Sequence, residues 1–411
     1  MTRLSETASF IVRRGVVATL LAVVGLLLAS VPAQAAGGPG APVPAAAAAA
    51  SQAGLSGVSC SAANACMAVG TALKGSPVLK GFPLAESWNG TAWTMKAIPS
   101  PKGATNSDLY AVSCGAPSTC VAVGMYEDAA APHGVPFAEA WNGTAWTVKT
   151  LPSPPGGSDP GLSGVSCASA QACLAVGNVI INGHNNAYSE LWNGTVWAIK
   201  TTPRPTGTTY SLLGGVSCRA ATSCTAVGNY QVNNSSKSKT LAEAWNGKTW
   251  AIKAAPNPKD GVNGADLSGV ACSSPLACTA VGGYDSLNNQ GDLTLAQAWN
   301  GKTWTIKTTP NPQGATGSNL SGVSCRAANA CMAVGGSGAN GLLSEVWNGT
   351  AWTIKAVPGP QGATFTSLNS VSCGAKNACA TVGYEVNSSQ AEVPVAEAWN
   401  GTAWTIKPVP F

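Results

Sequence analysis

The chain has 411 residues, of which 45% are hydrophobic and 9% are charged, and it contains 48 glycines and 27 prolines. Tryptophan and valine recur at fixed places along it, which excludes a disordered chain. Without the three arginines and one glutamate of residues 1–35, the 22 basic and 17 acidic residues become 19 and 16, a net charge of +3. So small and scattered a charge argues against nucleic acid or an anionic membrane surface as a partner.

Residues 1–35 have the pattern of a secretory signal peptide. Arg3, Arg13 and Arg14 form a basic start, residues 15–30 are apolar, and residues 33–35 fit a cleavage site. The Arg13-Arg14 pair leaves the route open between the general secretory and the twin-arginine pathways. We expect an extracellular protein with no membrane span after signal removal. Residues 36–54, rich in alanine, glycine and proline, indicate a linker, although they could add an edge strand.

Residues 55–411 form a sevenfold repeat. Seven C-x5-C pairs and seven W-N-G-x-x-W segments hold every cysteine and tryptophan, and successive first cysteines are 48 to 54 residues apart. The first repeat predicts strands A to D at 55–60, 65–70, 83–88 and 92–98, with Asn89-Gly90 as a two-residue hairpin between strands C and D.

Four short strands per repeat and no helical periodicity predict an all-β fold, a seven-bladed β-propeller with four antiparallel strands per blade. A parallel β-helix is the alternative, but it needs no tight hairpin in each repeat. The predicted blades span residues 55–107, 108–160, 161–211, 212–265, 266–318, 319–365 and 366–411. Each blade is expected to be one contiguous repeat, so that packing rather than strand exchange closes the ring.

The fifth repeat resembles a known family. Residues 277–312, ACTAVGGYDSLNNQGDLTLAQAWNGKTWTIKTTPNP, resemble a kelch repeat, as in the central domain of galactose oxidase. Gly282-Gly283 fits the kelch glycine doublet, Trp299 stands where tyrosine is usual, and Trp304 fits the tryptophan. Most other repeats keep one glycine of the doublet, and the C-x5-C pairs are not a kelch feature. The resemblance implies the fold and no particular activity, because kelch propellers host unrelated functions.

The cysteines predict one disulfide per blade. Even spacing in a secreted chain favours disulfides, and C-x5-C spans the hairpin between strands A and B. Zinc would need about four ligands per ion, and only His133 and His184 could supplement the thiols. We therefore expect no metal and no cofactor. The predicted pairs are Cys60–Cys66, Cys114–Cys120, Cys167–Cys173, Cys218–Cys224, Cys272–Cys278, Cys325–Cys331 and Cys373–Cys379.

The tryptophans are expected to pack between blades. Trp88 and Trp93 should project from one blade face, and seven equivalent copies are what packing requires, whereas a stacking platform for sugars or bases would need exposed rings. A glutamate two residues before the first tryptophan, replaced by Gln297 in the fifth repeat, is expected to satisfy backbone or ion-pair contacts between blades. The lysines three residues after each second tryptophan, such as Lys96, are expected to lie in solvent at the rim of the blades.

Function is expected on the face formed by the B–C and D–A loops. The A–B and C–D turns are uniform across repeats, whereas the B–C loops differ, and loops on a rigid scaffold usually carry function. Tyr126, Tyr230, Tyr284 and Tyr384 follow strand B and could form an aromatic rim. The candidate ligand-binding residues are Tyr126, Glu127, Asp128, His133, His184, Tyr188, Tyr230, Tyr284, Asp285, Tyr384 and Glu385.

These residues favour a non-enzymatic binding propeller, monomeric, whose partner is an extracellular polysaccharide or protein. No arginine cluster, phosphate loop or copper-oxidase pattern marks a catalytic site. A glycan-active hydrolase or lyase with its site in the central pocket of the same face is the alternative, for example one using His133 or His184 with a tyrosine. A structural envelope or matrix protein is the second alternative.

Overall fold

The computed structural model describes residues 52–75, 78–129, 134–233, 235–286, 291–338 and 341–411, with the backbone alone at residues 262 and 263. The predicted signal peptide, the predicted linker up to residue 51 and His133 lie outside these residues. Within them, the structure contains no helix that is long and apolar enough to cross a membrane.

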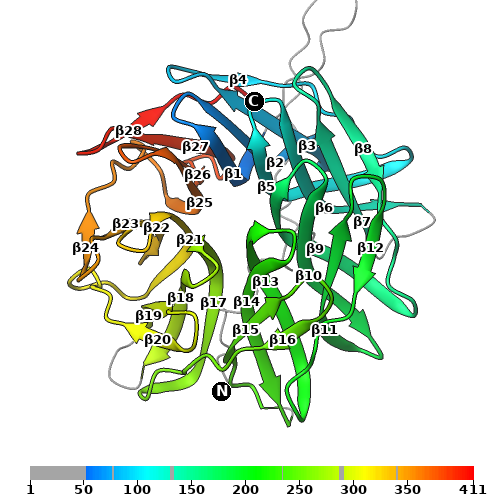
Figure 1. The fold of residues 1–411 in the computed structure, drawn as a ribbon. Coiled ribbons are helices and arrows are strands. Elements are labelled where there is room, and N and C mark those ends of the chain that lie inside the picture. The colour runs from blue at the N-terminus through cyan, green and yellow to red at the C-terminus, as the bar shows by residue number, and fades with distance from the viewer. Residues whose placement is uncertain (1–51, 76–77, 130–133, 234, 287–290, 339–340) are drawn as a thin grey trace, which may run out of the picture. The chain divides into compact units, whose positions relative to one another are not determined.

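Seven sheets, each of four antiparallel strands, stand around a central axis (Figure 1). The sequence prediction of a seven-bladed β-propeller is confirmed. Blades 1 to 4 consist of β1 (Gln52–Ala62), β2 (Ala65–Lys74), β3 (Lys80–Trp88), β4 (Trp93–Met95), β5 (Ala104–Ala116), β6 (Thr119–Asp128), β7 (Val135–Trp141), β8 (Trp146–Thr150), β9 (Gly157–Ser169), β10 (Ala172–Ile181), β11 (His184–Trp192), β12 (Trp197–Lys200), β13 (Thr208–Ala220), β14 (Ser223–Val232), β15 (Lys239–Trp245) and β16 (Trp250–Ile252).

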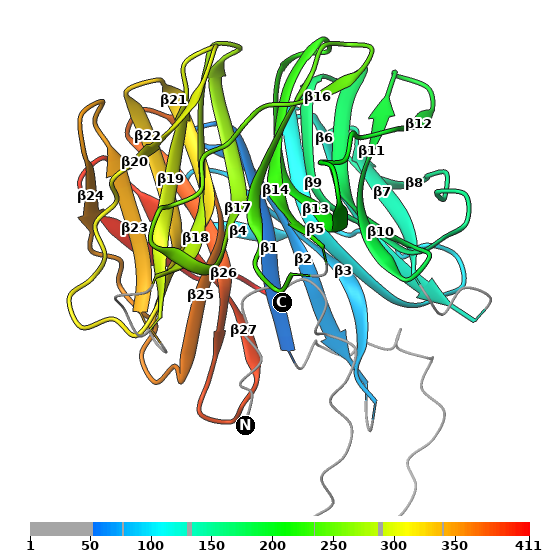
Figure 2. The ribbon, with the colours of Figure 1, turned by 90° about the horizontal axis from the view of Figure 1, so that it is seen from below.

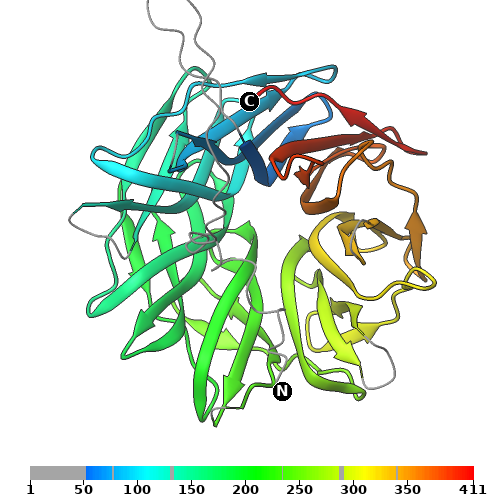
Figure 3. The same cartoon turned by 180° about the vertical axis from the view of Figure 1, so that it is seen from behind.

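Blades 5 to 7 repeat the same order. They consist of β17 (Gly261–Ser274), β18 (Ala277–Ser286), β19 (Asp292–Trp299), β20 (Trp304–Lys307), β21 (Ser318–Ala327), β22 (Ala330–Ser337), β23 (Gly341–Trp347), β24 (Trp352–Lys355), β25 (Phe365–Ala375), β26 (Ala378–Val386), β27 (Glu392–Trp399) and β28 (Trp404–Lys407). The first strand of each blade lies innermost, and the short fourth strand lies at the outer edge (Figures 1 and 3). Seen from the side, the strands run through the thickness of the ring (Figure 2).

Within residues 52–411 each blade is one contiguous stretch of chain, and no described strand is exchanged between the two ends of the propeller. Blade 1 meets blade 7 by packing and by hydrogen bonds from the Val58 and Cys60 amides to the Ser370 and Ser372 hydroxyls, at 3.2 and 2.9 Å. β1 begins at Gln52, three residues before the predicted boundary, because residues 52 to 54 pair with the end of β2.

A glycine in the second strand of every blade has a steric reason. A Cβ on Gly70 would lie 1.9 Å from the Gly54 carbonyl oxygen of β1, and one on Gly177 would lie 1.8 Å from that of Gly161 in β9. The two innermost strands approach each other too closely there for any side chain. This close approach explains the single glycine that each repeat keeps at the kelch-like position.

Seven disulfides join the first two strands, one in each blade, as predicted. Cys60 lies directly opposite Cys66 in the antiparallel register, with the two Cα atoms 3.9 Å apart. Disulfides in this number are typical of an extracellular, oxidising compartment.

The predicted two-residue hairpin between the third and fourth strands is wrong. Trp88 pairs with Trp93, so the connection has four residues, 89 to 92. The Asn89 side-chain oxygen accepts hydrogen bonds from the Thr91 and Ala92 amides, both at 2.9 Å, and Gly90 alone takes a positive φ, of 96°. The asparagine therefore organises the turn with its side chain and does not need a left-handed backbone.

Candidate functional site

The A–B and C–D turns of each blade contact one another at one end of the ring, and we call this end the turn face. In blade 1 a Cβ on Gly90 would lie 2.9 Å from the Asn64 side chain, and in blade 5 the same contact joins Gly301 to Leu276. The opposite end, which carries the B–C loops and the D–A segments, is the variable face. The sequence predicted this division.

The tryptophans occupy the interfaces between blades, as predicted. Trp88 and Trp93 pack with their ring centroids 5.5 Å apart and join a buried cluster with Ala380, Val382 and Ala396 of blade 7. In all seven blades the second tryptophan is buried. A tryptophan buries about 150–250 Å², so these rings contribute much of the contact between blades.

The interface glutamates do not behave as predicted. The six are completely buried, and neither carboxyl oxygen has a hydrogen-bond partner among the described residues. Burial raises the pKa of each to about 8, namely Glu86, Glu139, Glu190, Glu243, Glu345 and Glu397. Only Gln297 makes the expected contact: its amide nitrogen donates to the Pro256 carbonyl of the preceding blade at 2.9 Å.

The lysines after the second tryptophan are half-buried rather than solvated. Lys407 of blade 7 places its Nζ 5.9 Å from the centroid of the Trp88 ring in blade 1, a cation–π distance. Lys407 therefore reaches across to the next blade.

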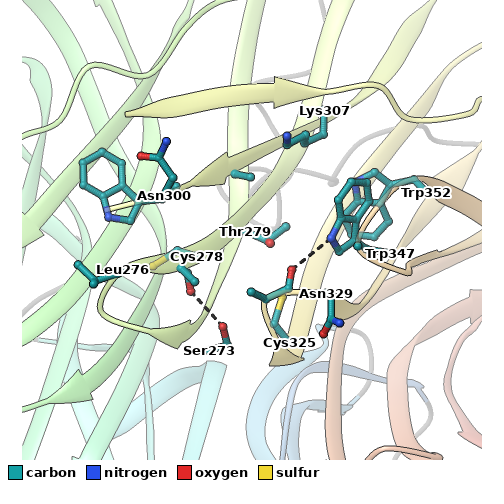
Figure 4. Close-up of a pocket in the computed structure, with 15 residues that line it drawn as sticks. Ser273, Leu276, Cys278, Thr279, Asn300, Lys307, Cys325, Asn329, Trp347 and Trp352 are labelled. Carbon is teal, nitrogen blue, oxygen red and sulfur yellow. Dashed lines mark hydrogen bonds between the residues drawn. The ribbon is translucent and has the colours of Figure 1, made fainter. Parts of the chain in front are cut away.

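A pocket of about 480 Å³ opens on the turn face between blades 5 and 6 (Figure 4). Trp347 and Trp352 form one wall, with their ring centroids 5.7 Å apart. The Trp347 indole N–H is engaged, because it donates to the Ala328 carbonyl at 3.2 Å, so the ring is held in a fixed orientation. Trp299 and Leu276 lie on the blade 5 side, and the Leu276 side chain is 66% exposed.

Polar side chains complete this pocket. Asn300, Lys307 and Thr279 come from blade 5, and Asn329 comes from the A–B turn of blade 6 (Figure 4). The Asn300 side-chain oxygen accepts the Lys302 and Thr303 amides, both at 2.9 Å, which leaves the amide nitrogen as its donor toward a ligand. The pocket thus combines the partly exposed Trp347 ring, backed by the buried Trp352, with several hydrogen-bonding side chains.

The predicted aromatic rim on the variable face packs into the blades. Tyr126, Tyr230 and Tyr284 are partly buried, and each packs against a core cluster that its own blade shares with the preceding blade. Tyr126 meets Phe137 edge-on at 5.8 Å, and Tyr384 packs against Phe365 at 5.8 Å. Burial, followed by the charge of Asp128, raises the pKa of Tyr126.

Tyr188 is a correction to the candidate set. It is 4% exposed and lies in the core between blades 2 and 3, so it cannot form part of a surface site. Burial, and next the charge of Glu190, raise its pKa well above the usual value. His184, by contrast, is exposed at the start of β11. Glu127 and Glu385 lie near the ends of β6 and β26, and burial raises the pKa of Glu385.

Blade 5 gathers several carboxylates at its variable end. Burial raises the pKa of Asp266 to about 6; the hydrogen bond from the Ser268 hydroxyl opposes this shift and the charge of Asp292 adds to it. The pKa of Asp292 is also raised, first by burial and then by the charge of Asp285. Asp266 is not among the residues predicted from the sequence, because one aspartate in a strand gives no signal. Among the described residues, no group of three or more His, Cys, Asp or Glu side chains could hold a metal ion.

Comparisons with known proteins show the fold and no more. No family model matches the chain, and no curated protein matches it, so the kelch resemblance stays a prediction. The propeller domain of the Trilobed protease from Pyrococcus furiosus, which has an open velcro topology, is 8% identical, with 86% of this chain and 97% of that one covered and a TM-score of 0.51.

Two further solved structures are similar at lower TM-scores. The six-bladed fungal lectin from Aleuria aurantia is 14% identical, with 73% of this chain and 94% of that one covered and a TM-score of 0.43. A protein of unknown function from Dyadobacter fermentans is 13% identical, with coverages of 70% and 92% and a TM-score of 0.46.

Proposed function

We propose that this protein is a secreted, non-enzymatic carbohydrate-binding propeller, and that the pocket between blades 5 and 6 on the turn face binds the sugar. The observation that carries the proposal is the wall formed by Trp347 and Trp352, which faces Asn300, Lys307 and Thr279 across about 480 Å³. This site lies on the face opposite to the one that the sequence favoured.

The chemistry of the pocket suits a sugar ring. The C–H groups on one side of a pyranose are apolar and can lie against an indole face, whereas the hydroxyl groups around its edge need hydrogen-bonding partners. Two asparagine amides, a threonine hydroxyl and a lysine ammonium supply donors and acceptors around the tryptophans. A volume of about 480 Å³ is within the usual range for small-ligand sites.

The same lining argues against catalysis at this place. Among the described residues that line the pocket there is no aspartate, glutamate or histidine. Glycoside hydrolysis needs a pair of carboxyl groups, one acting as acid and the other as base or nucleophile. We therefore propose binding without turnover at this pocket.

The test is a glycan array on the purified mature protein, paired with an assay for released reducing ends. A pocket-filling variant, Thr279→Met with Ala298→Val, copies the residues Met332 and Val346 that blade 6 has at the same positions. We expect it to lose at least tenfold in affinity for the array hits while its melting temperature stays within a few degrees. Glu127→Gln, on the variable face, is the matched control and should bind normally. Unchanged binding by the filled variant, or release of reducing ends, would sink the proposal.

A further inference from the structure

The exposure of the first tryptophan differs between blades, although the second is always buried. Trp192, Trp299 and Trp347 are partly exposed, whereas the other four, Trp88, Trp141, Trp245 and Trp399, are at most 8% exposed. Because the repeat sequence around these rings is uniform, the cause lies in the neighbouring blade.

In the 5/6 pocket two residues of the preceding blade lie beside Trp347, and the repeat gives the other interfaces residues at the same two positions. One is the residue after the second cysteine, and the other is the residue before the first tryptophan of that blade. Large side chains occur there at three interfaces: Met67 shares a buried cluster with Trp141, Leu174 and Leu191 share one with Trp245, and Met332 and Val346 share one with Trp399.

Three interfaces have smaller residues at the same two positions. Blade 2 presents Val121 and Ala140 to Trp192, blade 4 presents Thr225 and Ala244 to Trp299, and blade 5 presents Thr279 and Ala298 to Trp347. The interfaces on either side of blade 5 share their geometry, because the Thr225 hydroxyl lies 3.6 Å from the Cys278 sulfur and the Thr279 hydroxyl 3.5 Å from the Cys331 sulfur.

The interface between blades 7 and 1 is closed in another way. Its two covering residues, Ala380 and Ala398, are small, but Lys407 lies over the Trp88 ring and Trp88 is 7% exposed. At this interface Lys407 therefore takes the place of the large side chains that cover the ring elsewhere.

We propose that the propeller has three equivalent sugar-binding slots, at the 2/3, 4/5 and 5/6 interfaces, and so binds its carbohydrate multivalently. This inference rests on the proposed function, since the 5/6 slot is the pocket described above. Each slot combines the partly exposed tryptophan of one blade with an asparagine and a lysine of the preceding blade. These are Asn142 and Lys149 at the 2/3 slot, Asn246 and Lys253 at the 4/5 slot, and Asn300 and Lys307 at the 5/6 slot.

The slots differ at two positions, which predicts their relative strength. The 2/3 slot has Val121 where the other two have a threonine hydroxyl, and the A–B turn of the following blade offers Gln171 at the 2/3 slot and Asn329 at the 5/6 slot, but Leu276 at the 4/5 slot. A hydroxyl or an amide can bond a sugar hydroxyl, whereas valine and leucine cannot, so the 5/6 slot, which has both groups, should be the strongest. Three sites on one rigid ring suit a ligand that presents many copies of one sugar, such as a polysaccharide, because linked binding events raise the overall affinity.

The test counts bound ligands. Native mass spectrometry would use the methyl glycosides of glucose, galactose, mannose and N-acetylglucosamine, and we expect three copies per chain of the one that binds. The filling pairs Val121→Met/Ala140→Val, Thr225→Met/Ala244→Val and Thr279→Met/Ala298→Val should each remove one copy, and the three combined should remove all. Met332→Thr with Val346→Ala gives the 6/7 interface the two residues of the 5/6 slot and should add a fourth copy. This variant tests the inference independently of the filling variants, should one of those fail to fold.

The outcomes separate this inference from the proposed function. A single bound copy that only the 5/6 filling pair removes would overturn the three-slot inference and leave the proposed function standing. No binding of any of these glycosides or of any array glycan would overturn both. Binding that survives all three filling pairs would also overturn both, because it would place the ligand elsewhere on the ring.

Discussion

At the scale of single residues, the six interface glutamates are buried without hydrogen-bond partners among the described residues. A charged carboxylate without a partner is expensive in a protein interior, and the group takes up a proton instead. Gln297 indicates what the neutral acid can do, because its amide donates to the Pro256 carbonyl at 2.9 Å. Every repeat has a proline six residues after its second tryptophan, as Pro256 follows Trp250. A protonated glutamate carries one O–H donor and can make the same bond.

We therefore expect the propeller to lose stability as the pH rises. The pKa of about 8 for each of the six glutamates lies above the value of 4.5 that applies when it is exposed. The folded chain thus binds more protons than the unfolded chain between these values. The stabilisation is complete below about pH 4.5 and is lost as the pH rises through about 8. Calorimetry should show a melting temperature that decreases over this window.

Neighbouring groups modify this behaviour at individual interfaces. Lys96 beside Glu86 and Lys149 beside Glu139 favour the charged carboxylate, after the larger opposing effect of burial. The Tyr188 phenol lies near Glu190. Burial alone raises the pKa of Glu190, Glu243 and Glu397, and Glu243 is the one chosen for substitution.

Two variants isolate the effect. Glu243→Gln should weaken the pH dependence by about one part in six, and Gln297→Glu should steepen it by a similar amount, because each changes the number of titrating carboxyls by one. The comparison of the two slopes is the measurement. Equal slopes in both variants would show that other groups control the pH response.

At the scale of elements, the four-residue turn between the third and fourth strands depends on its asparagine. The Asn142 side-chain oxygen accepts the Thr144 and Ala145 amides at 3.0 and 2.9 Å. Asn142→Ala should lower the free energy of unfolding by about 0.5–1.5 kcal/mol, since two turn amides lose their acceptor to water. The urea midpoint is the measurement, and Asn142→Asp, which keeps an acceptor, should stay close to the wild type. A midpoint unchanged by alanine would mean that the backbone alone fixes the turn.

The repeat allowed the sequence to predict the blades, the disulfides and the interface role of the tryptophans, because all three follow from spacing. The turn register was missed because Asn-Gly is common in two-residue hairpins, whereas here Trp88 pairs with Trp93. Tyr188 was misplaced for a similar reason. It was assigned to a loop, but β11 begins at His184 and carries it into the core.

At the scale of the whole molecule, the sequence sorted the loops onto two faces but directed attention to the variable one. The 5/6 pocket depends on Thr279 and Ala298 of one blade lying against Trp347 of the next. No single repeat contains this combination, and its signal is the small size of residues that face each other across an interface. The signal becomes visible only when residues of one repeat are aligned with the residues of the next repeat that they face across the interface.

Hydrogen bonds between neighbouring innermost strands also run around the ring. At six interfaces the amide of the first cysteine donates to the serine just before the first cysteine of the preceding blade, at 2.9 to 3.1 Å. The exception is the 5/6 interface, where Ala271 replaces that serine. Ala271→Ser should therefore add the missing bond and raise the free energy of unfolding by about 1 kcal/mol.

The same bond should matter most between blades 7 and 1, since no covalent link joins them. Ser372→Ala removes the acceptor of the Cys60 amide, and Ser113→Ala removes that of the Cys167 amide between blades 2 and 3, which the chain itself connects. We expect Ser372→Ala to accelerate amide hydrogen exchange at Cys60 and its β1 neighbours. We expect Ser113→Ala to accelerate exchange around Cys167 by a smaller factor. Only the 7/1 interface can open by separation of the two ends of the propeller. Equal acceleration at the two sites would mean that packing of the tryptophans, not this bond, holds the ring closed.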